Sequence, residues 1–162
     1  VTIFEQLYTA AGGKVDGVYA ANDGLAGSVI SILDKNRRAG QVPVTGQDAT
    51  VEGLQNILAG TQCMTVYKSA TEEAGALAKV AIALANGQKA ETNSTSRDDQ
   101  GNRDVPSVLL TPKSITKDNV DVAIEHVVTD RQKFLDGLSE LTAQNLKSGD
   151  IAYEGIPGQK QP

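Results

Sequence analysis

The sequence predicts an α/β protein in which helices flank a parallel sheet. Short apolar segments and helical segments alternate at intervals of about 20–26 residues, which is typical of βαβ units. The apolar segments do not alternate strictly with polar residues, and this favours strands that are covered on both faces. Turns that contain glycine or Asn-Asp-Gly separate the segments, as expected between a strand and the helix that follows it.

The first part of the chain predicts an opening helix and then two strand–helix pairs. Apolar residues at helical spacing indicate the helices, and turn residues end them. In chain order we expect a helix over Thr2–Ala11, a strand over Val15–Ala21, a helix over Leu25–Arg37, a strand over Val42–Thr45 and a helix over Val51–Ala59. Asp23 is expected to cap the second helix, and Leu25 to lie on its apolar face.

The remaining chain predicts further elements around a polar insertion. In order, these are a strand over Cys63–Tyr67, an alanine-rich helix over Thr71–Ala85, a loop or hairpin over Gln88–Asp104, a strand over Val108–Thr111, a helix from Thr116 onward, a helical run over Asp130–Leu146 and an irregular tail over Gly149–Pro162. The strands are apolar and bounded by turn residues, and Pro112 limits the last of them.

Composition excludes several classes of function. The 162 residues carry 15 Lys and Arg against 20 Asp and Glu, a formal charge of −5, which disfavours nucleic acid as a partner. The single cysteine, Cys63, cannot close an internal disulfide, and the single histidine, His126, leaves no zinc ligand set. We therefore expect no metal and no cofactor.

No apolar run approaches the roughly 20 residues of a membrane helix. Val1 opens the chain without a signal segment, as expected of a mature protein or a piece of one.

Polar residues follow three of the expected strands. Asn22 and Asp23 follow the first, Asp48 follows the second, and Lys68 follows the third. Ligands of parallel α/β sheets bind beyond the carboxyl ends of the strands. An amide, carboxylates and an ammonium group suit a polyhydroxylated ligand. The purely structural alternative is that Asp23 caps a helix, Asp48 turns the chain and Lys68 is solvated.

Enzyme chemistry has little support in the sequence. Neither a GxSxG elbow nor a Walker A loop occurs, and no serine or cysteine is placed to use His126 as a base. We expect His126 to be structural and Cys63 to pack as a small apolar residue. Asp98 and Asp99 are expected to be solvated, because calcium sites need more oxygen ligands. The sequence thus favours a binding protein and not an enzyme.

Four segments carry a resemblance to a known family. VDGVYAANDGLA (Val15–Ala26) resembles the "avfaaNDgmA" segment of type I periplasmic sugar-binding proteins, and VTGQDA (Val44–Ala49) is similar to their "vvGfDa" segment, with Gln47 in place of an aromatic or apolar residue. AGTQCMTVYK (Ala59–Lys68) resembles "aGTQtMTVYK" of the D-xylose-binding branch, and DVPSVLLTP (Asp104–Pro112) resembles its "DVPSvLLTP". The four occur in order at family-like spacing.

The resemblance implies an extracytoplasmic solute-binding component of an ABC importer that binds a pyranose such as D-xylose in an interlobe cleft. Asn22, Asp48 and Lys68 match the family's sugar ligands. Asn22 would bridge ring hydroxyls, Asp48 would accept from two hydroxyls, and Lys68 would donate to a hydroxyl or ring oxygen. Asp23 is expected to support the loop. The implied partners are the monosaccharide and the ABC permease, with no nucleic acid.

The resemblance also implies an incomplete fold, the C-terminal lobe portion of a type I periplasmic-binding-protein fold. We expect a partial sugar-binding lobe over residues 1–125 and a helical extension with an irregular tail over residues 126–162. Unpaired sheet edges and exposed apolar surface predict self-association. The absence of half the cleft predicts weak sugar affinity. The alternatives are a sugar-sensing ectodomain of a signalling system and the effector core of a sugar-responsive repressor. The repressor would need an upstream DNA-binding motif.

Overall fold

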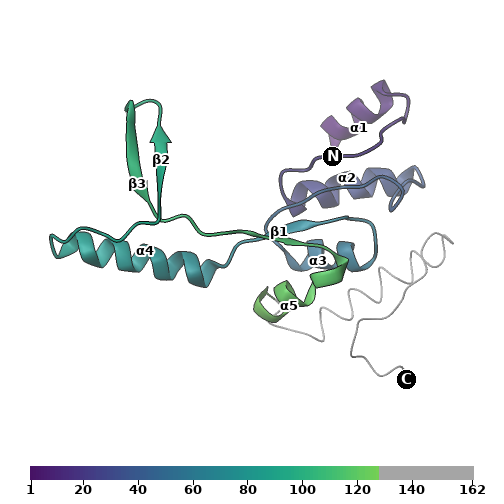
Figure 1. The fold of residues 1–162 in the computed structure, drawn as a ribbon. Helices are drawn as coiled ribbons and strands as arrows, with labels where there is room; N and C mark the ends of the chain where they lie inside the picture. The colour runs from purple at the N-terminus through teal and green to yellow at the C-terminus, as the bar shows by residue number, and fades with distance from the viewer. Residues whose placement is uncertain (128–162) are drawn as a thin grey trace, which may run out of the picture. The chain divides into compact units, whose positions relative to one another are not determined.

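The computed structural model describes residues 1–127. The chain divides into two compact units (Figure 1). The first unit comprises residues 1–67 together with the described residues from 114 onward, and the second comprises residues 68–113. Each unit is described by itself. The boundary that we expect after residue 125 stays a prediction, and the expected helical run over Asp130–Leu146 and the tail lie outside the described residues.

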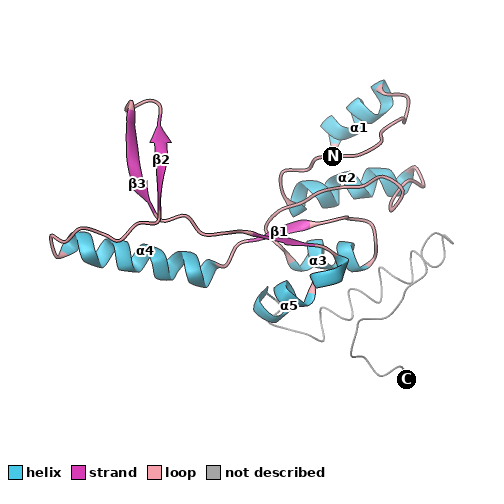
Figure 2. Ribbon diagram, viewed as in Figure 1, coloured by secondary structure: helices cyan, strands magenta, loops and turns pink. Residues whose placement is uncertain are grey.

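Helices make up most of the regular secondary structure of the first unit, as Figure 2 shows. They are α1 (Thr2–Ala10), α2 (Asp23–Lys35), α3 (Val51–Leu58), the short 3-10 helix η1 (Lys117–Asn119) and α5 (Asp121–Val127). All lie where helical spacing predicts them. Two of the starts are set by side-chain caps: Asn22 Oδ1 accepts from Leu25 N at 2.9 Å, and Thr50 Oγ1 accepts from Gly53 N at 3.0 Å. Such caps satisfy N–H groups that the first helical turn leaves without partners.

The expected parallel sheet is only partly formed among the described residues. The segments over 15–21 and 42–45 are extended but meet in a single parallel bridge between Val18 and Val44. The regular strands of this unit are β1 (Thr65–Tyr67) and β4 (Lys113–Ile115), which pair with each other. Pro43 gives a physical reason for the short pairing, because proline has no N–H to continue a ladder.

Backbone hydrogen bonds nevertheless place the segment over 42–48 between its two neighbours. On one side, Val18 N donates to Pro43 O at 2.9 Å and Thr45 N donates to Val18 O at 3.1 Å. On the other side, Cys63 N donates to Val44 O at 2.9 Å and Asp48 N donates to Val66 O at 2.9 Å. The bridge between Val18 and Val44 is parallel, and on the other side residue numbers rise together from Cys63 and Val44 to Val66 and Asp48. The chain directions therefore match those of the expected parallel sheet.

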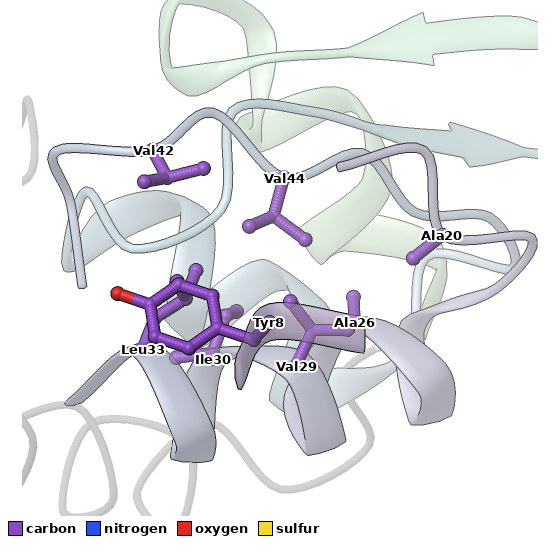
Figure 3. Packing of buried hydrophobic residues seen from close by; sticks show 8 residues of the cluster. All are labelled: Tyr8, Ala20, Ala26, Val29, Ile30, Leu33, Val42 and Val44. Carbon is purple, nitrogen blue, oxygen red and sulfur yellow. The ribbon is translucent and has the colours of Figure 1, made fainter. Parts of the chain in front are cut away.

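Two apolar clusters form the core of the first unit. Figure 3 shows one of them, in which α2 packs beneath the extended segments; its buried members are Tyr8, Ala20, Ala26, Val29, Ile30, Leu33, Val42 and Val44. The second joins α3 to α5 and β4, with buried members Ala49, Leu54, Leu58, Ile115, Val120 and Ala123. The expectation for Leu25 is wrong: it is 54% exposed, although Asp23 and Ala26 in the same turn of α2 are buried.

The second unit contains α4 (Ala70–Ala85) and a hairpin of β2 (Ser94–Asp98) and β3 (Arg103–Ser107). The two strands pair antiparallel, with Ser94 opposite Ser107, which confirms the hairpin expected within the polar insertion. No residue from 68 to 113 is buried. Helix α4 therefore exposes apolar side chains to solvent, among them Leu77, Ile82 and Leu84.

The strand expected over Val108–Thr111 is wrong, since that segment forms neither helix nor strand. Asn93 explains the difference. Its Oδ1 accepts from Leu109 N and its Nδ2 donates to Leu109 O, both at 2.8 Å. The amide side chain thus occupies the backbone groups that a neighbouring strand would otherwise pair. Within residues 1–127, no helix combines the length and hydropathy that crossing a membrane requires.

Candidate functional site

Two of the expected strand ends lie side by side in the first unit. Asp23 N donates to Gln47 O at 2.9 Å, which joins the end of the first extended segment to the end of the second. Asp48 N donates to Val66 O at 2.9 Å, which joins the second end to β1. These two bonds place Asn22 and Asp48 on neighbouring chain ends, at the edge where ligands of α/β sheets bind.

Asp23 is the buried centre of this edge. Its side chain is 1% exposed, and its carboxylate accepts four hydrogen bonds. Oδ2 accepts from Thr50 N at 2.8 Å and from Thr50 Oγ1 at 3.1 Å. Oδ1 accepts from Gln62 Nε2 at 2.9 Å and from Thr65 Oγ1 at 2.8 Å. A buried carboxylate is costly unless its oxygens are bonded in this way, so Asp23 ties three chain segments together.

The expected cap role of Asp23 is wrong, because Asn22 is the residue that caps α2. Asn22 has extended backbone angles, and its Oδ1 accepts from Leu25 N. Asp23 is already helical, and its carboxylate points to α3 and β1 partners. Asn22 is half-buried. Its Oδ1 accepts the cap hydrogen bond from Leu25 N, and its Nδ2 group can donate to a further partner.

Asp48 sits in a strained turn. Asp48 has φ 95° and Ala49 has φ 48°, a region that costs a non-glycine residue about 1–3 kcal/mol. Three consecutive amides hold this turn: Asp48 N bonds Val66 O, Ala49 N bonds Thr65 Oγ1 at 3.1 Å, and Thr50 N bonds Asp23 Oδ2. The turn is over-determined by its surroundings, and it leaves the Asp48 side chain exposed.

Two glycines let the Asp23 carboxylate come this close to its neighbours. A Cβ on Gly46 would lie 2.2 Å from Asp23 Oδ1 and 2.4 Å from Gln62 Nε2. A Cβ on Gly53 would lie 2.2 Å from Asp23 Oδ2. Real Cβ atoms do not approach other heavy atoms this closely, so both positions require glycine for close packing rather than for backbone freedom.

Lys68, the third expected ligand, opens the second unit. It is exposed and is bonded directly to Tyr67, the last residue of β1. Tyr67 is half-buried against the second apolar cluster and stacks on His126, with ring centroids 5.9 Å apart and an interplanar angle of 5°. His126 therefore has a packing contact, as expected of a structural residue. The stack restrains Tyr67, the residue that precedes Lys68.

Two other residues were considered from the sequence, Cys63 in the first unit and Asp98 in the second. Cys63 is exposed, so the expectation that it packs inside is wrong; its Sγ donates to Val44 O at 3.1 Å. Asp98 accepts from Gly101 N at 2.9 Å and from Arg103 Nε at 3.2 Å within the hairpin. Among residues 1–127, no cluster of His, Cys, Asp and Glu is suited to hold a metal ion.

Sequence reasoning missed three residues of the Asp23 network, namely Thr50, Gln62 and Thr65. Gln62 and Thr65 are 2% and 0% exposed. One signal was available: both are polar residues within the largely apolar segment over 61–67, and buried polar groups need partners. The identity of the partner, Asp23, was not readable because it lies 39 and 42 residues earlier in the chain.

Comparison with known proteins gives close relatives. A family model described as the periplasmic binding protein domain matches residues 1–89. A xylitol-binding protein from Mycolicibacterium smegmatis is 48% identical over 151 residues, which cover 93% of this chain. A D-xylose-binding periplasmic protein from Escherichia coli is 43% identical over 118 residues, which cover 73% of this chain. The matched parts span only 39% and 35% of the two relatives' own lengths.

A solved structure has the same fold. An ABC transporter solute-binding protein from Clostridium phytofermentans, with bound β-D-glucose, superimposes with a TM-score of 0.68 at 26% identity. The match covers 82% of this chain and 42% of that one. It confirms that the chain has part of a periplasmic-binding-protein fold.

These proteins confirm the expected class, since each is named as a binding protein and none as an enzyme. The periplasmic relative agrees with the expected extracytoplasmic location. The family model covers residues 1–89 of 162, more than half of the chain. This chain belongs to the periplasmic binding protein domain family.

Proposed function

We propose that this chain supplies part of the sugar-binding surface of the solute-binding component of an ABC importer, and that its ligand is a pyranose such as D-xylose. The observation that carries the proposal is the strained turn at Asp48, whose exposed side chain lies on a chain end that is hydrogen-bonded to the chain end of Asn22. Strain that is over-determined by its surroundings concentrates at ligand sites. The names of the xylitol-binding and D-xylose-binding relatives support the same class of ligand.

Each proposed ligand residue has a distinct role in recognising hydroxyl groups. Asp48 accepts from two neighbouring hydroxyls, because a carboxylate has two oxygens and no proton to give. Asn22 donates through Nδ2, since its Oδ1 is engaged by Leu25 N. Lys68 donates to a hydroxyl or to the ring oxygen. Hydrogen bonds with an ionised partner are about twice as strong as neutral ones, so Asp48 and Lys68 carry most of the recognition.

The proposed partners follow from this role. A solute-binding component delivers its sugar to the permease of the importer, on the outer side of the cell membrane. No cofactor is needed, because capture of a sugar by hydrogen bonds involves no chemical step.

Thermal unfolding with a sugar panel tests the proposal. A ligand that binds the folded state raises stability by RT ln(1 + [L]/Kd), so D-xylose or xylitol should raise the Tm in a concentration-dependent way. Glycerol at matched osmolality controls for the general stabilisation that excluded solutes give. D-glucose in the same panel asks whether the site admits a hexose.

Asp48→Asn is the matched variant for this experiment. Asparagine tolerates positive φ as aspartate does, so the turn is kept while the charge is removed. The sugar-dependent Tm shift should be lost in Asp48→Asn and kept in Asp34→Asn, which changes an exposed carboxylate on α2. The proposal fails if no sugar raises the Tm more than glycerol does, or if Asp48→Asn responds as the unmodified chain does.

A further inference from the structure

We infer that Thr65 is a positioning residue for the sugar site: its buried hydroxyl sets the strained turn that presents Asp48. This inference rests on the proposed function, but its structural part can be measured without any sugar. Thr65 is 0% exposed and cannot touch a ligand itself. It acts through the backbone of Ala49 and through the carboxylate of Asp23.

The two hydrogen bonds of the Thr65 hydroxyl have only one possible direction. Ala49 N–H can only donate, so Thr65 Oγ1 accepts from it at 3.1 Å. The Thr65 hydroxyl in turn donates its proton to Asp23 Oδ1 at 2.8 Å. The hydroxyl is therefore oriented by its neighbours and links the buried carboxylate to the backbone of the turn.

Strand β1 supplies two of the three acceptors that hold the turn. Thr65 Oγ1 binds the amide of Ala49, and the next residue, Val66, binds the amide of Asp48 through its carbonyl oxygen. Asp23 Oδ2 binds the third amide, that of Thr50. The position of β1 thus sets the backbone at Asp48 and Ala49, both of which have positive φ.

A side chain without a hydroxyl cannot make the two hydrogen bonds of Thr65. A valine has nearly the same shape and would fill the same buried space, but it would leave both Ala49 N–H and one lone pair of Asp23 Oδ1 without this partner. Unsatisfied buried groups favour a rearrangement that restores bonding. Releasing the Ala49 amide removes one of the bonds that hold the positive φ, so the turn relaxes and the carboxylate of Asp48 moves out of position.

The experiment compares Thr65→Val with Thr65→Ser in the full chain. Amide hydrogen exchange by NMR reports the turn directly, and a chemical-shift titration with D-xylose reports affinity into the millimolar range. Thr65→Val should speed exchange at Ala49 and Thr50 and weaken D-xylose binding by about tenfold. Thr65→Ser keeps the hydroxyl, so it should restore both readouts even though it loses a buried methyl group.

Ile32→Val separates positioning from general stability. Ile32 is 1% exposed in α2, and losing one methyl there destabilises the fold without touching the turn. It should leave D-xylose affinity unchanged. The inference is overturned if Thr65→Val keeps normal exchange at Ala49, or if Ile32→Val weakens binding as much as Thr65→Val does.

Two further outcomes remain interpretable. If the unmodified chain binds no sugar, the proposed function fails, yet exchange at Ala49 and Thr50 still decides whether Thr65 sets the turn. If Thr65→Val does not fold, the unmodified chain provides the test: the hydroxyl proton of Thr65 should give a slowly exchanging resonance close to the Ala49 amide proton. Its absence under conditions where other buried hydroxyl protons are observed would overturn the inference.

Discussion

Asp23 and Thr50 are joined by two hydrogen bonds to a single oxygen, from Thr50 N at 2.8 Å and from Thr50 Oγ1 at 3.1 Å to Asp23 Oδ2. Thr50 also caps α3 by accepting from Gly53 N. The buried carboxylate therefore anchors the start of α3 while it holds the end of the strained turn. The start of α3 and the geometry of the turn at Asp48 and Ala49 therefore depend on the same group.

Replacing Asp23 with asparagine should destabilise the chain by about 2–3 kcal/mol. The amide has a single oxygen where the carboxylate has two, and its NH2 group would face hydrogen-bond donors. Urea unfolding followed by circular dichroism measures the change. Asp16→Asn, an exposed position, serves as the control and should shift stability by less than about 0.5 kcal/mol. Equal effects of the two variants would mean that the network contributes nothing.

The helix glycines Gly53 and Gly27 form a second matched pair. Alanine in a helix gains about 1 kcal/mol over glycine from propensity alone. At Gly27 a Cβ would meet Glu52 Oε1 at 2.5 Å, the far end of a side chain that can move away, so Gly27→Ala should be neutral or stabilising. At Gly53 the Cβ would meet the Asp23 carboxylate, which is held by its four bonds.

Gly53→Ala should therefore destabilise by about 1–3 kcal/mol despite its better helix propensity. Thermal and urea unfolding of both variants measure the difference. Opposite signs for the two substitutions support the packing argument. A Gly53→Ala chain as stable as Gly27→Ala would show that Asp23 can move at little cost.

The hairpin predicts a local pH dependence. The Gly101 N–H bond first, and then the bond from Arg103, hold the pKa of Asp98 below its usual value of 3.8. A lowered folded pKa means that the stabilisation is fully present above the unfolded pKa and is lost as pH falls through the folded one. Chemical shifts of the hairpin amides should change below pH 3.8, and Asp98→Asn should remove that transition. A transition above pH 3.8 would contradict the assignment.

Self-association is expected from α4. Leu77 and Leu84 lie seven residues apart on one helix face and are 70% and 63% exposed, so a second copy of the chain can bury them. Light scattering after size exclusion should detect a species larger than 17.0 kDa. Leu77→Glu with Leu84→Glu should shift it toward monomer, whereas a charge change at Lys79 should not. A monomer at all concentrations tested would refute the expectation.

Local signals explain why the helices were predictable. Apolar residues at helical spacing and nearby turn residues are local features of the sequence. The sequence nevertheless placed the cap of α2 one residue late, at Asp23, whereas Asn22 and Thr50 cap α2 and α3. The strands were less predictable, because pairing depends on partners elsewhere. Leu109 lies in an apolar run that favours a strand, yet Asn93, sixteen residues earlier, occupies its backbone groups.

The candidate ligand residues stay a prediction, although the structure brings two of their chain ends together. Turn residues after apolar segments pointed to Asn22, Asp48 and Lys68, and the structure joins the first two chain ends through Asp23 N and Gln47 O. The role of Thr65 was not readable, because its hydroxyl bonds groups 16 and 42 residues away. A polar side chain at a buried position indicates that a hydrogen-bond partner exists, but only the folded structure identifies that partner.

Mapping of the D-xylose site by amide chemical shifts tests the central claim most directly. In a titration of the unmodified chain, the largest shifts should fall at residues 22–25 and 47–50 and should saturate with one affinity. The same titration of Asp48→Asn should leave these amides unmoved. Shifts confined to other residues, or an unchanged response in Asp48→Asn, would contradict a sugar site built on the Asp48 turn.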